Sequence, residues 1–318
     1  MVYEGNSMAK VISIRFLLFI MSFIIFVACA IKNETSMPPK DDISPINIYP
    51  NPQSGYGAAP DQLAQPDDVE LLANGDLIIS DVDNNRIQVF SRNGALQKTI
   101  DAKSLDMENS EIVPTGISSD EAGYVYVTLE GVGSVARFNP DLTLDQLVGY
   151  QGRVSSEQYY LDRNDGLLIK PQGIIVSAGG DIYVADMDKT IFRKEGVYNF
   201  GFRKFKQIVT EDVTSYVYDK EFAATQEITT IMRKSEGMAI SEERGLLLVA
   251  EEKPQKNQFG NSEKFRYIGV FDLNTGKFNN RLIGVEMVDG KITSGYSKDS
   301  IEGLSVFGQY IFAVDEKA

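Results

Sequence analysis

The feature that most constrains the fold is a pattern of four short strand-forming segments that recurs along the chain. The first copy spans Pro66–Ile100 and contains four such segments: Asp68–Leu72, Leu77–Ser80, Arg86–Phe90 and Ala95–Ile100. β-Branched runs separated by Asn-Gly and other polar turns predict successive antiparallel hairpins. Four strands in about 35 residues cannot bury both faces of a sheet alone, so the unit is expected to repeat.

Four further copies begin at Pro114, Pro171, Glu236 and Glu302. Starts that lie roughly 48 to 66 residues apart match a four-stranded blade followed by a loop of variable length. The sequence therefore predicts an all-β fold, a β-propeller of four-stranded antiparallel blades over residues 46–318. The fifth copy has only two strands before Ala318, so we expect the last blade or blades to be cut off and the full ring to have six blades.

Copies one and three share a more specific pattern. It consists of the entry Pro171-x-Gly173, the second strand Ile182–Asp186 and the third strand Arg86–Phe90. This pattern resembles the NHL repeat, and the resemblance spans roughly residues 46–318. It implies the propeller fold but not an activity, because such propellers have many unrelated functions.

Two segments follow the strand pattern less clearly. Tyr198–Arg233 contains aromatic and basic residues and then an alternating run, which we interpret as the outer strand of blade three plus an inserted hairpin. In the fourth copy, Lys253–Gln258 begins what we interpret as a long loop that ends near Phe265. That loop is either a solvated insertion or a rim loop over a binding face.

The N-terminal residues 1–29 have the pattern of a secretory signal. Lys10 and Arg15 form a positive region, and Phe16–Val27 forms an apolar region. The small residue before Cys29 resembles the bacterial lipobox, which implies that Cys29 is lipidated. The alternative is an uncleaved transmembrane anchor.

Both interpretations place the domain outside the cytoplasm and attach it to a bacterial membrane. Residues 30–45 are polar and contain proline, as expected of a tether between the anchor and the domain. Ala30, the residue after the cysteine, favours the outer membrane by resemblance to known lipoproteins.

The composition excludes several classes of function. A formal net charge of −14 argues against nucleic-acid binding. The chain has no histidine, which excludes Ser-His-Asp and Cys-His catalysis and the usual zinc ligand. Cys29 is the only cysteine, so no internal disulfide can form. We expect a monomer that binds a protein or a small molecule.

Carboxylates are expected to gather on one face. In a propeller, the start of each innermost strand and the end of each second strand lie at the same channel mouth. These positions hold Asp68, Asp81, Glu130, Asp186, Glu236, Glu251, Glu302 and Asp315. Converging carboxylates raise one another's pKa unless a cation neutralises them, and oxygen ligands without histidine or thiolate favour calcium. For Asp81 and Asp186, capping of a polar turn is the alternative role.

Copies four and five also contain Glu-Gly entries, in Glu236-Gly237 and in the segment Asp299–Leu304. With the paired glutamates that begin at Glu251, they resemble the calcium-dependent β-propeller phytases. The resemblance implies calcium ligands at Glu236, Glu251 and Glu302, with Asp299 as a further candidate. It also implies a bound phosphate, for which the sequence offers Lys170 and Arg233, and a metal-bound water as nucleophile.

Three functions therefore stay open at this point. The first is a membrane-anchored propeller that binds a ligand or partner on an acidic, calcium-binding face. The second is a calcium-dependent phosphoesterase, and the third is a scaffold that only binds proteins. Calcium-dependent stability separates the first two from the third.

Overall fold

The structure is a computed structural model of residues 1–318. The residues that it describes are 10–13, 56–108, 110–149, 166–186, 202–211, 213–222, 237–256, 262–283, 285–288, 291–294, 301–308 and 310–315. The chain forms two compact units, Leu18–Lys220 and Met1–Leu17 with Glu221–Ala318. In the described ranges the only helical elements are two short 3-10 turns, η2 (Lys103–Leu105) and η4 (Glu242–Arg244). The protein is therefore all-β, as predicted.

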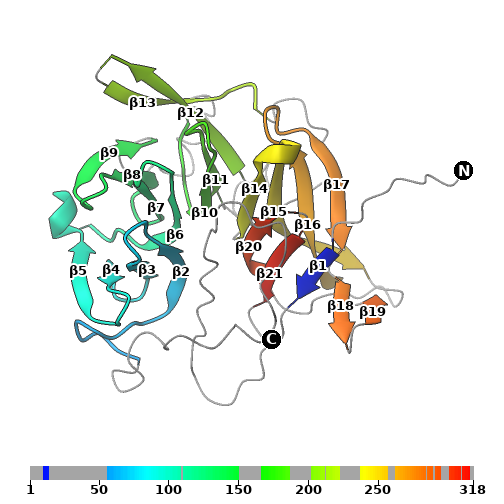
Figure 1. The fold of residues 1–318 in the computed structure, drawn as a ribbon, viewed down its shortest axis with the longest axis horizontal. Helices are drawn as coiled ribbons and strands as arrows, with labels where there is room; N and C mark the ends of the chain where they lie inside the picture. Colours follow the sequence, from blue (N-terminus) through cyan, green and yellow to red (C-terminus); the bar gives the residue numbers. More distant parts are fainter. Residues whose placement is uncertain are drawn as a thin grey trace, which may run out of the picture. The chain divides into compact units, whose positions relative to one another are not determined.

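The unit Leu18–Lys220 contains three four-stranded antiparallel sheets, whose strands pair in sequence order (Figure 1). Blade one consists of β2 (Pro66–Leu71), β3 (Leu77–Asp81), β4 (Arg86–Phe90) and β5 (Leu96–Asp101). Blade two consists of β6 (Pro114–Ser119), β7 (Val125–Leu129), β8 (Ser134–Phe138) and β9 (Leu144–Val148). Blade three consists of β10 (Pro171–Val176), β11 (Ile182–Asp186), β12 (Phe202–Thr210) and β13 (Val213–Tyr218). These sheets are the predicted blades.

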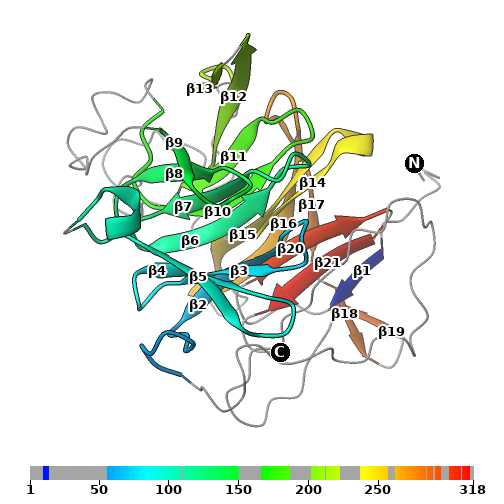
Figure 2. The ribbon, with the colours of Figure 1, turned by 60° about the vertical axis from the view of Figure 1, so that its left-hand side comes forward.

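The blades pack through their first strands, since β6 contacts both β2 and β10 (Figure 2). Alternating apolar residues fill the space between neighbouring sheets. Ile78 and Ile87 of blade one share a buried cluster with Val127 and Phe138 of blade two. Tyr126 of blade two shares another with Val184 of blade three. Sheets that are stacked through their innermost strands are the arrangement that propeller blades adopt.

The first strand of each of these blades contains a bulge near its start, where the ladder register shifts. In blade two, the Thr128 hydroxyl accepts a hydrogen bond from Gly116 N at 2.7 Å. In blade one, the Ser80 hydroxyl accepts one from Asp68 N at 2.8 Å. A hydroxyl on the second strand therefore satisfies a backbone donor that the bulge leaves outside the ladder.

Gly116 lies within this bulge, where blade two closely approaches blade three. A Cβ at this position would overlap the backbone oxygen of Gln172 and lie 3.0 Å from Ile174 N. The glycine of the Pro-x-Gly entry is thus required by packing between blades rather than by a special backbone angle.

We expect Gly116→Ala to destabilise the protein by about 1–3 kcal/mol, because neighbouring backbone must shift to admit the methyl group. Urea denaturation measures the loss. Gly179→Ala is the matched control, since its Cβ would meet nothing closer than the Ser177 hydroxyl at 3.8 Å. Equal stability of the two variants would contradict this account of the entry glycine.

The second unit contains one further four-stranded sheet, blade four, in the order β14 (Met238–Ser241), β15 (Leu246–Lys256), β16 (Ser262–Asp272) and β17 (Phe278–Ile283). β20 (Ile301–Phe307) and β21 (Tyr310–Asp315) form the hairpin of the predicted fifth blade. β18 (Val285–Val288) and β19 (Lys291–Ser294) form a separate hairpin. One buried cluster joins blade four to this fifth hairpin.

Two sequence interpretations need correction. In the described part of Tyr198–Arg233, the outer strand of blade three is present as β13, but the strand that pairs with it, β12, is the third strand of the blade and not part of an inserted hairpin. In blade four, Lys253–Lys256 extends β15, and Lys253 pairs with Phe265 of β16. The start of the predicted long loop is instead a continuation of the hairpin. Backbone pairing between the two strands extends beyond their apolar residues, and the polar composition of Lys253–Lys256 did not indicate this.

The N-terminal segment also differs from expectation at one place. Residues 1–29 are predicted to lie outside the fold, but β1 (Lys10–Ser13) pairs in parallel with β21, with Lys10 opposite Tyr310. β1 thus occupies the edge of a two-stranded hairpin, whose backbone groups would otherwise lack ladder partners. The predicted lipidation site Cys29 and the predicted tether lie outside the described residues, so the signal, the lipid and the tether stay predictions. No helix in the described ranges is both long and apolar enough to cross a bilayer.

Candidate functional site

Asp81 and Asp186, two predicted ligand-binding residues, instead fix the local backbone. Asp81 is fully buried and accepts hydrogen bonds from Ala64 N at 2.6 Å, Asn84 Nδ2 at 2.8 Å and Arg86 Nε at 2.7 Å. Asp186 is buried and accepts from Ile169 N and Lys170 N, both at 2.9 Å. Each carboxylate ends a second strand and holds the segment that enters the same blade. Both carboxylates therefore have a structural role, but their backbone donors belong to the segment before the first strand of the blade rather than to the polar turn after the second strand.

Asp68 joins blade one to blade two. Its Oδ2 accepts a hydrogen bond from Ile117 N at 2.7 Å, and its Oδ1 accepts one from Val69 N at 2.8 Å. The residue as a whole is partly exposed, but its carboxyl group is enclosed by protein. This enclosure raises the pKa of Asp68 to about 7, although the two backbone donors oppose the shift. Burial likewise raises the pKa of Glu70, which accepts from the Ser119 hydroxyl on blade two.

Glu130 and Lys170, predicted as ligand-binding residues, lie together at the entry corner between blades two and three. Lys170 Nζ is 2.5 Å from Glu130 Oε1, and Gln172 Nε2 donates to Glu130 Oε2 at 2.5 Å. Lys170 has a side chain that is 54% exposed, whereas that of Glu130 is 22% exposed. The corner is therefore an accessible polar surface whose charges are paired. A bound anion would compete with Glu130 for Lys170.

The remaining predicted residues belong to the second unit. Glu302 lies in β20 at a register shift, between Ile301, which pairs with Asp315, and Gly303, which pairs with Val314. Glu251 lies in β15, opposite Tyr267. Three other predicted residues lie outside the described ranges: Arg233, Glu236 and Asp299. Among the described side chains, no group of three or more acidic or cysteine residues lies close enough to hold a metal ion.

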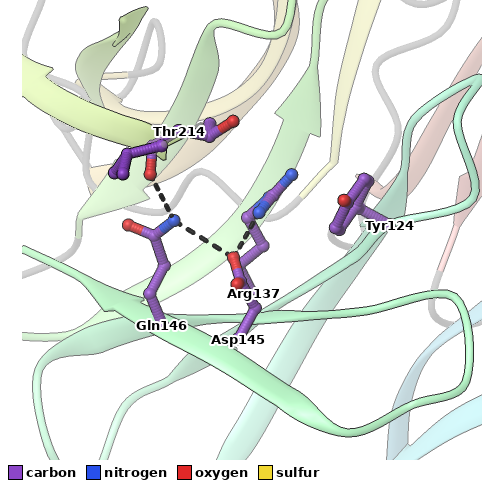
Figure 3. Close-up of a pocket in the computed structure, with 6 residues that line it drawn as sticks. Tyr124, Arg137, Asp145, Gln146 and Thr214 are labelled. Carbon is purple, nitrogen blue, oxygen red and sulfur yellow. Dashed lines mark hydrogen bonds and ion pairs between the residues drawn. The ribbon is translucent and has the colours of Figure 1, made fainter. Parts of the chain in front are cut away.

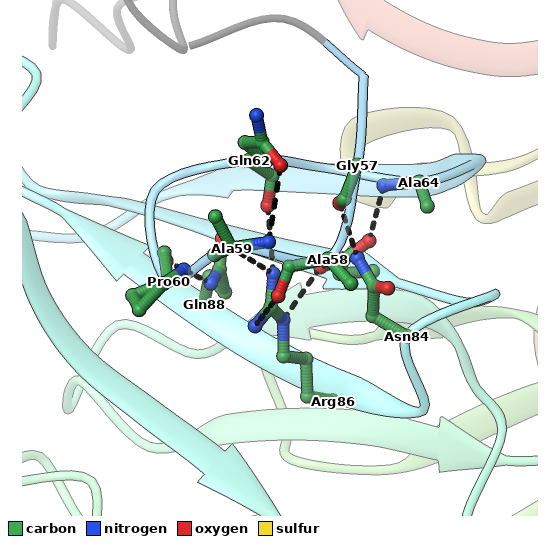
Figure 4. Close-up of polar contacts among 10 residues, drawn as sticks. Gly57, Ala58, Ala59, Pro60, Gln62, Ala64, Asn84, Arg86 and Gln88 are labelled. Atoms are coloured by element: carbon green, nitrogen blue, oxygen red, sulfur yellow. Dashed lines mark hydrogen bonds and ion pairs between the residues drawn. The ribbon is translucent and has the colours of Figure 1, made fainter.

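The loop of residues 57–64 is fixed against blade one by polar side chains (Figure 4). Arg86 Nη2 donates to the backbone oxygens of Ala59 and Gln62 at 2.8 Å each. Asn84 Nδ2 donates to Gly57 O at 2.9 Å. The segment that follows the predicted ligand-binding residue Asp81 thus binds the chain's own entry loop.

Sequence reasoning missed a pocket between blades two and three. It is lined by Tyr124, Arg137, Asp145, Gln146, Val213 and Thr214, and its volume is about 350 Å³ (Figure 3). One signal was available. Arg137 of β8 and Val89 of β4 are both the residue before the final phenylalanine of a third strand. An arginine at a position where another copy has a buried valine indicates a specialised site.

Comparisons with known proteins agree with the blade assignment. The family model described as NHL repeat matches residues 63–90, which contain β2, β3 and β4. No curated protein matches the chain. A gluconolactonase of Xanthomonas campestris is similar in structure at 15% identity and a TM-score of 0.48, over 80% of this chain and 70% of that one. A virginiamycin B lyase of Staphylococcus aureus is similar at 11% identity and a TM-score of 0.43, over 79% and 77%. Likeness at this level carries no information about chemistry.

Proposed function

We propose that this protein is an extracytoplasmic β-propeller, tethered to a membrane through a lipid on Cys29, that binds a ligand or protein partner on the face where its innermost strands begin. The tether rests on the sequence pattern of residues 16–29. The binding face is supported by the accessible, paired corner of Glu130 and Lys170. The described carboxylates of this face either cap backbone or pair with cations, which suits recognition better than catalysis.

The observation that most favours calcium on this face comes from the backbone of the second unit. Ala250 and Ile301 belong to one buried cluster. Glu251 and Glu302 are the next residues along the two strands, and Asp315 is the ladder partner of Ile301. Three acidic positions therefore follow or face residues that belong to one cluster. Carboxylate oxygens are the ligands that calcium prefers, so these backbone positions support a calcium site in this unit.

The same positions favour a calcium-dependent phosphoesterase as a second candidate. In that case Glu236, Glu251 and Glu302 would hold calcium, which would supply charge for binding phosphate and for activating water. Asp299 and Arg233 would be further candidates for the metal and the phosphate. The protein-binding scaffold is the outcome if calcium does not bind.

We expect calcium to stabilise the purified protein, and the double substitution Glu236→Gln with Glu302→Gln to abolish that effect. At a calcium concentration one hundred times the dissociation constant, the added stability is about 2.7 kcal/mol. Thermal melts with chelator and with millimolar calcium measure it. Glu242→Gln with Glu243→Gln, on the exposed η4 turn, is a control with the same change in charge.

If calcium raises the melting temperature of the wild type and of the control, but not that of the double variant, the result supports the site. A rise that persists in the double variant would overturn these ligands. Absence of any rise would exclude both calcium readings and leave the scaffold. If calcium does stabilise the protein, release of phosphate from inositol phosphates would separate the phosphoesterase from the binding protein.

A further inference from the structure

The pocket between blades two and three is separate from the proposed entry face. Four of its residues come from blade two, and Val213 and Thr214 come from the outer strand of blade three. Its volume of about 350 Å³ is at the lower end of the range of ligand pockets, about 300–1,000 Å³. It therefore has room for a small molecule rather than for a polymer.

A buried arginine forms the centre of the pocket wall. Arg137 is 4% exposed, and its guanidinium carbon lies 3.5 Å from the centroid of the Tyr124 ring. Its Nε donates to the Tyr126 hydroxyl at 3.2 Å, and its Nη1 pairs with Asp145. Its Nη2 makes no hydrogen bond within the described ranges. It is not one of the fully enclosed polar atoms without a partner, so it is accessible and can donate to an acceptor on a ligand.

Acceptors lie beside this donor (Figure 3). Gln146 Nε2 donates to Thr214 O at 2.9 Å and to Asp145 Oδ2 at 3.1 Å. These bonds fix the orientation of the Gln146 amide. They also leave its Oε1 and the Asp145 Oδ1 without a donor in the part of the chain that the structure describes. The pocket thus presents one donor group and two acceptor oxygens, of which that of Asp145 is the nearer to the guanidinium and that of Gln146 lies on the other side of its amide nitrogen (Figure 3).

The charge of the pocket selects the class of ligand. Arg137 and Asp145 neutralise each other, so neither an anion nor a cation gains a net electrostatic attraction. A hydroxyl group both donates and accepts hydrogen bonds. A ligand with neighbouring hydroxyls can therefore accept from the Arg137 guanidinium and donate to the acceptor oxygens of the pocket. We propose that this pocket binds a small neutral saccharide of one or two rings.

The test uses the full-length protein and a panel of glucose, galactose, mannose, N-acetylglucosamine, maltose and cellobiose. Saturation-transfer NMR identifies binders, and calorimetry measures affinity. We expect at least one sugar to bind with a dissociation constant of about 1 mM or tighter. Val213→Trp would fill the pocket and should weaken binding at least tenfold. Asp145→Asn, which keeps the shape but removes the charge, should weaken it as well.

Val217→Trp is the matched control, because Val213 and Val217 lie on the same exposed strand and are 61% and 51% exposed. Val217 does not line the pocket, so this variant should bind like the wild type. Three results would overturn the proposal: no sugar of the panel binds, Val213→Trp binds as tightly as Val217→Trp, or acetate or phosphate binds more tightly than every sugar.

Discussion

Replacement of Asp81 by alanine is expected to destabilise the protein by about 3–5 kcal/mol. That is the usual cost of removing one partner of a buried ion pair, since the other charge loses its compensation. Here Arg86 would lose its carboxylate, while its side chain is only 12% exposed. The Ala64 amide and the Asn84 side chain would lose their acceptor at the same time.

The size of this effect follows from what Asp81 connects. It joins the end of β3, the start of β4 and the entry loop, so its loss should also loosen residues 57–64. Because whole domains are stable by only about 5–15 kcal/mol, the variant should unfold at a clearly lower urea concentration.

Urea denaturation of the wild type and of Asp61→Ala provides the comparison. Asp61 is exposed and lies in the same entry loop, so its removal should have little effect. Asp81→Asn keeps one acceptor oxygen and should lie between the two. If Asp81→Ala is as stable as Asp61→Ala, then Asp81 does not hold the loop, and its assignment as a ligand-binding residue regains support.

Much of the fold could be predicted because each blade repeats strong local signals. Gly75 and Gly94 mark turns with positive φ, and the apolar runs between such turns became the strands of blades one and two. Blade three was harder, because its third strand contains Arg203 and Lys204, both buried. Lys204 is paired with Asp181 at 2.9 Å, a partner from the preceding hairpin that the sequence does not reveal.

The candidate site was less predictable, because an aspartate at these positions can either hold the local backbone or bind a ligand. Asp68, Asp81 and Asp186 all occupy the positions that propeller geometry places at the channel mouth, yet each accepts hydrogen bonds from backbone amides. Whether an aspartate caps a turn or meets a ligand depends on which amide donors lie within about 3 Å, and several of these donors come from distant residues. Conversely, Arg137 looks like a surface arginine until the Tyr124 ring and Asp145 enclose it.

Because of Asp68, the free energy of unfolding of the protein should fall as the pH rises. Its pKa is about 7 in the folded state and 3.8 in the reference state, so the native protein holds a proton that the unfolded chain releases. Between these two values the native state binds more protons, and the free energy of unfolding therefore decreases with pH. The decrease from pH 4 to pH 8 is on the order of 4 kcal/mol for this group. Glu70 shifts in the same direction and adds to the slope.

Asp68→Asn should remove this pH-dependent contribution. The stability curves of the variant and the wild type, plotted against pH, should therefore cross. Near pH 4 the variant should be slightly less stable, because one amide oxygen cannot replace both oxygens that accept from Ile117 N and Val69 N. At pH 8 it should be more stable, because no charge is enclosed. Urea denaturation at pH 4, 6 and 8 measures both signs. Asp61→Asn, at an exposed residue of the entry loop, should keep the wild-type dependence on pH. A pH profile of Asp68→Asn that runs parallel to the wild type would show that the Asp68 carboxyl is ionised in the folded protein throughout this range.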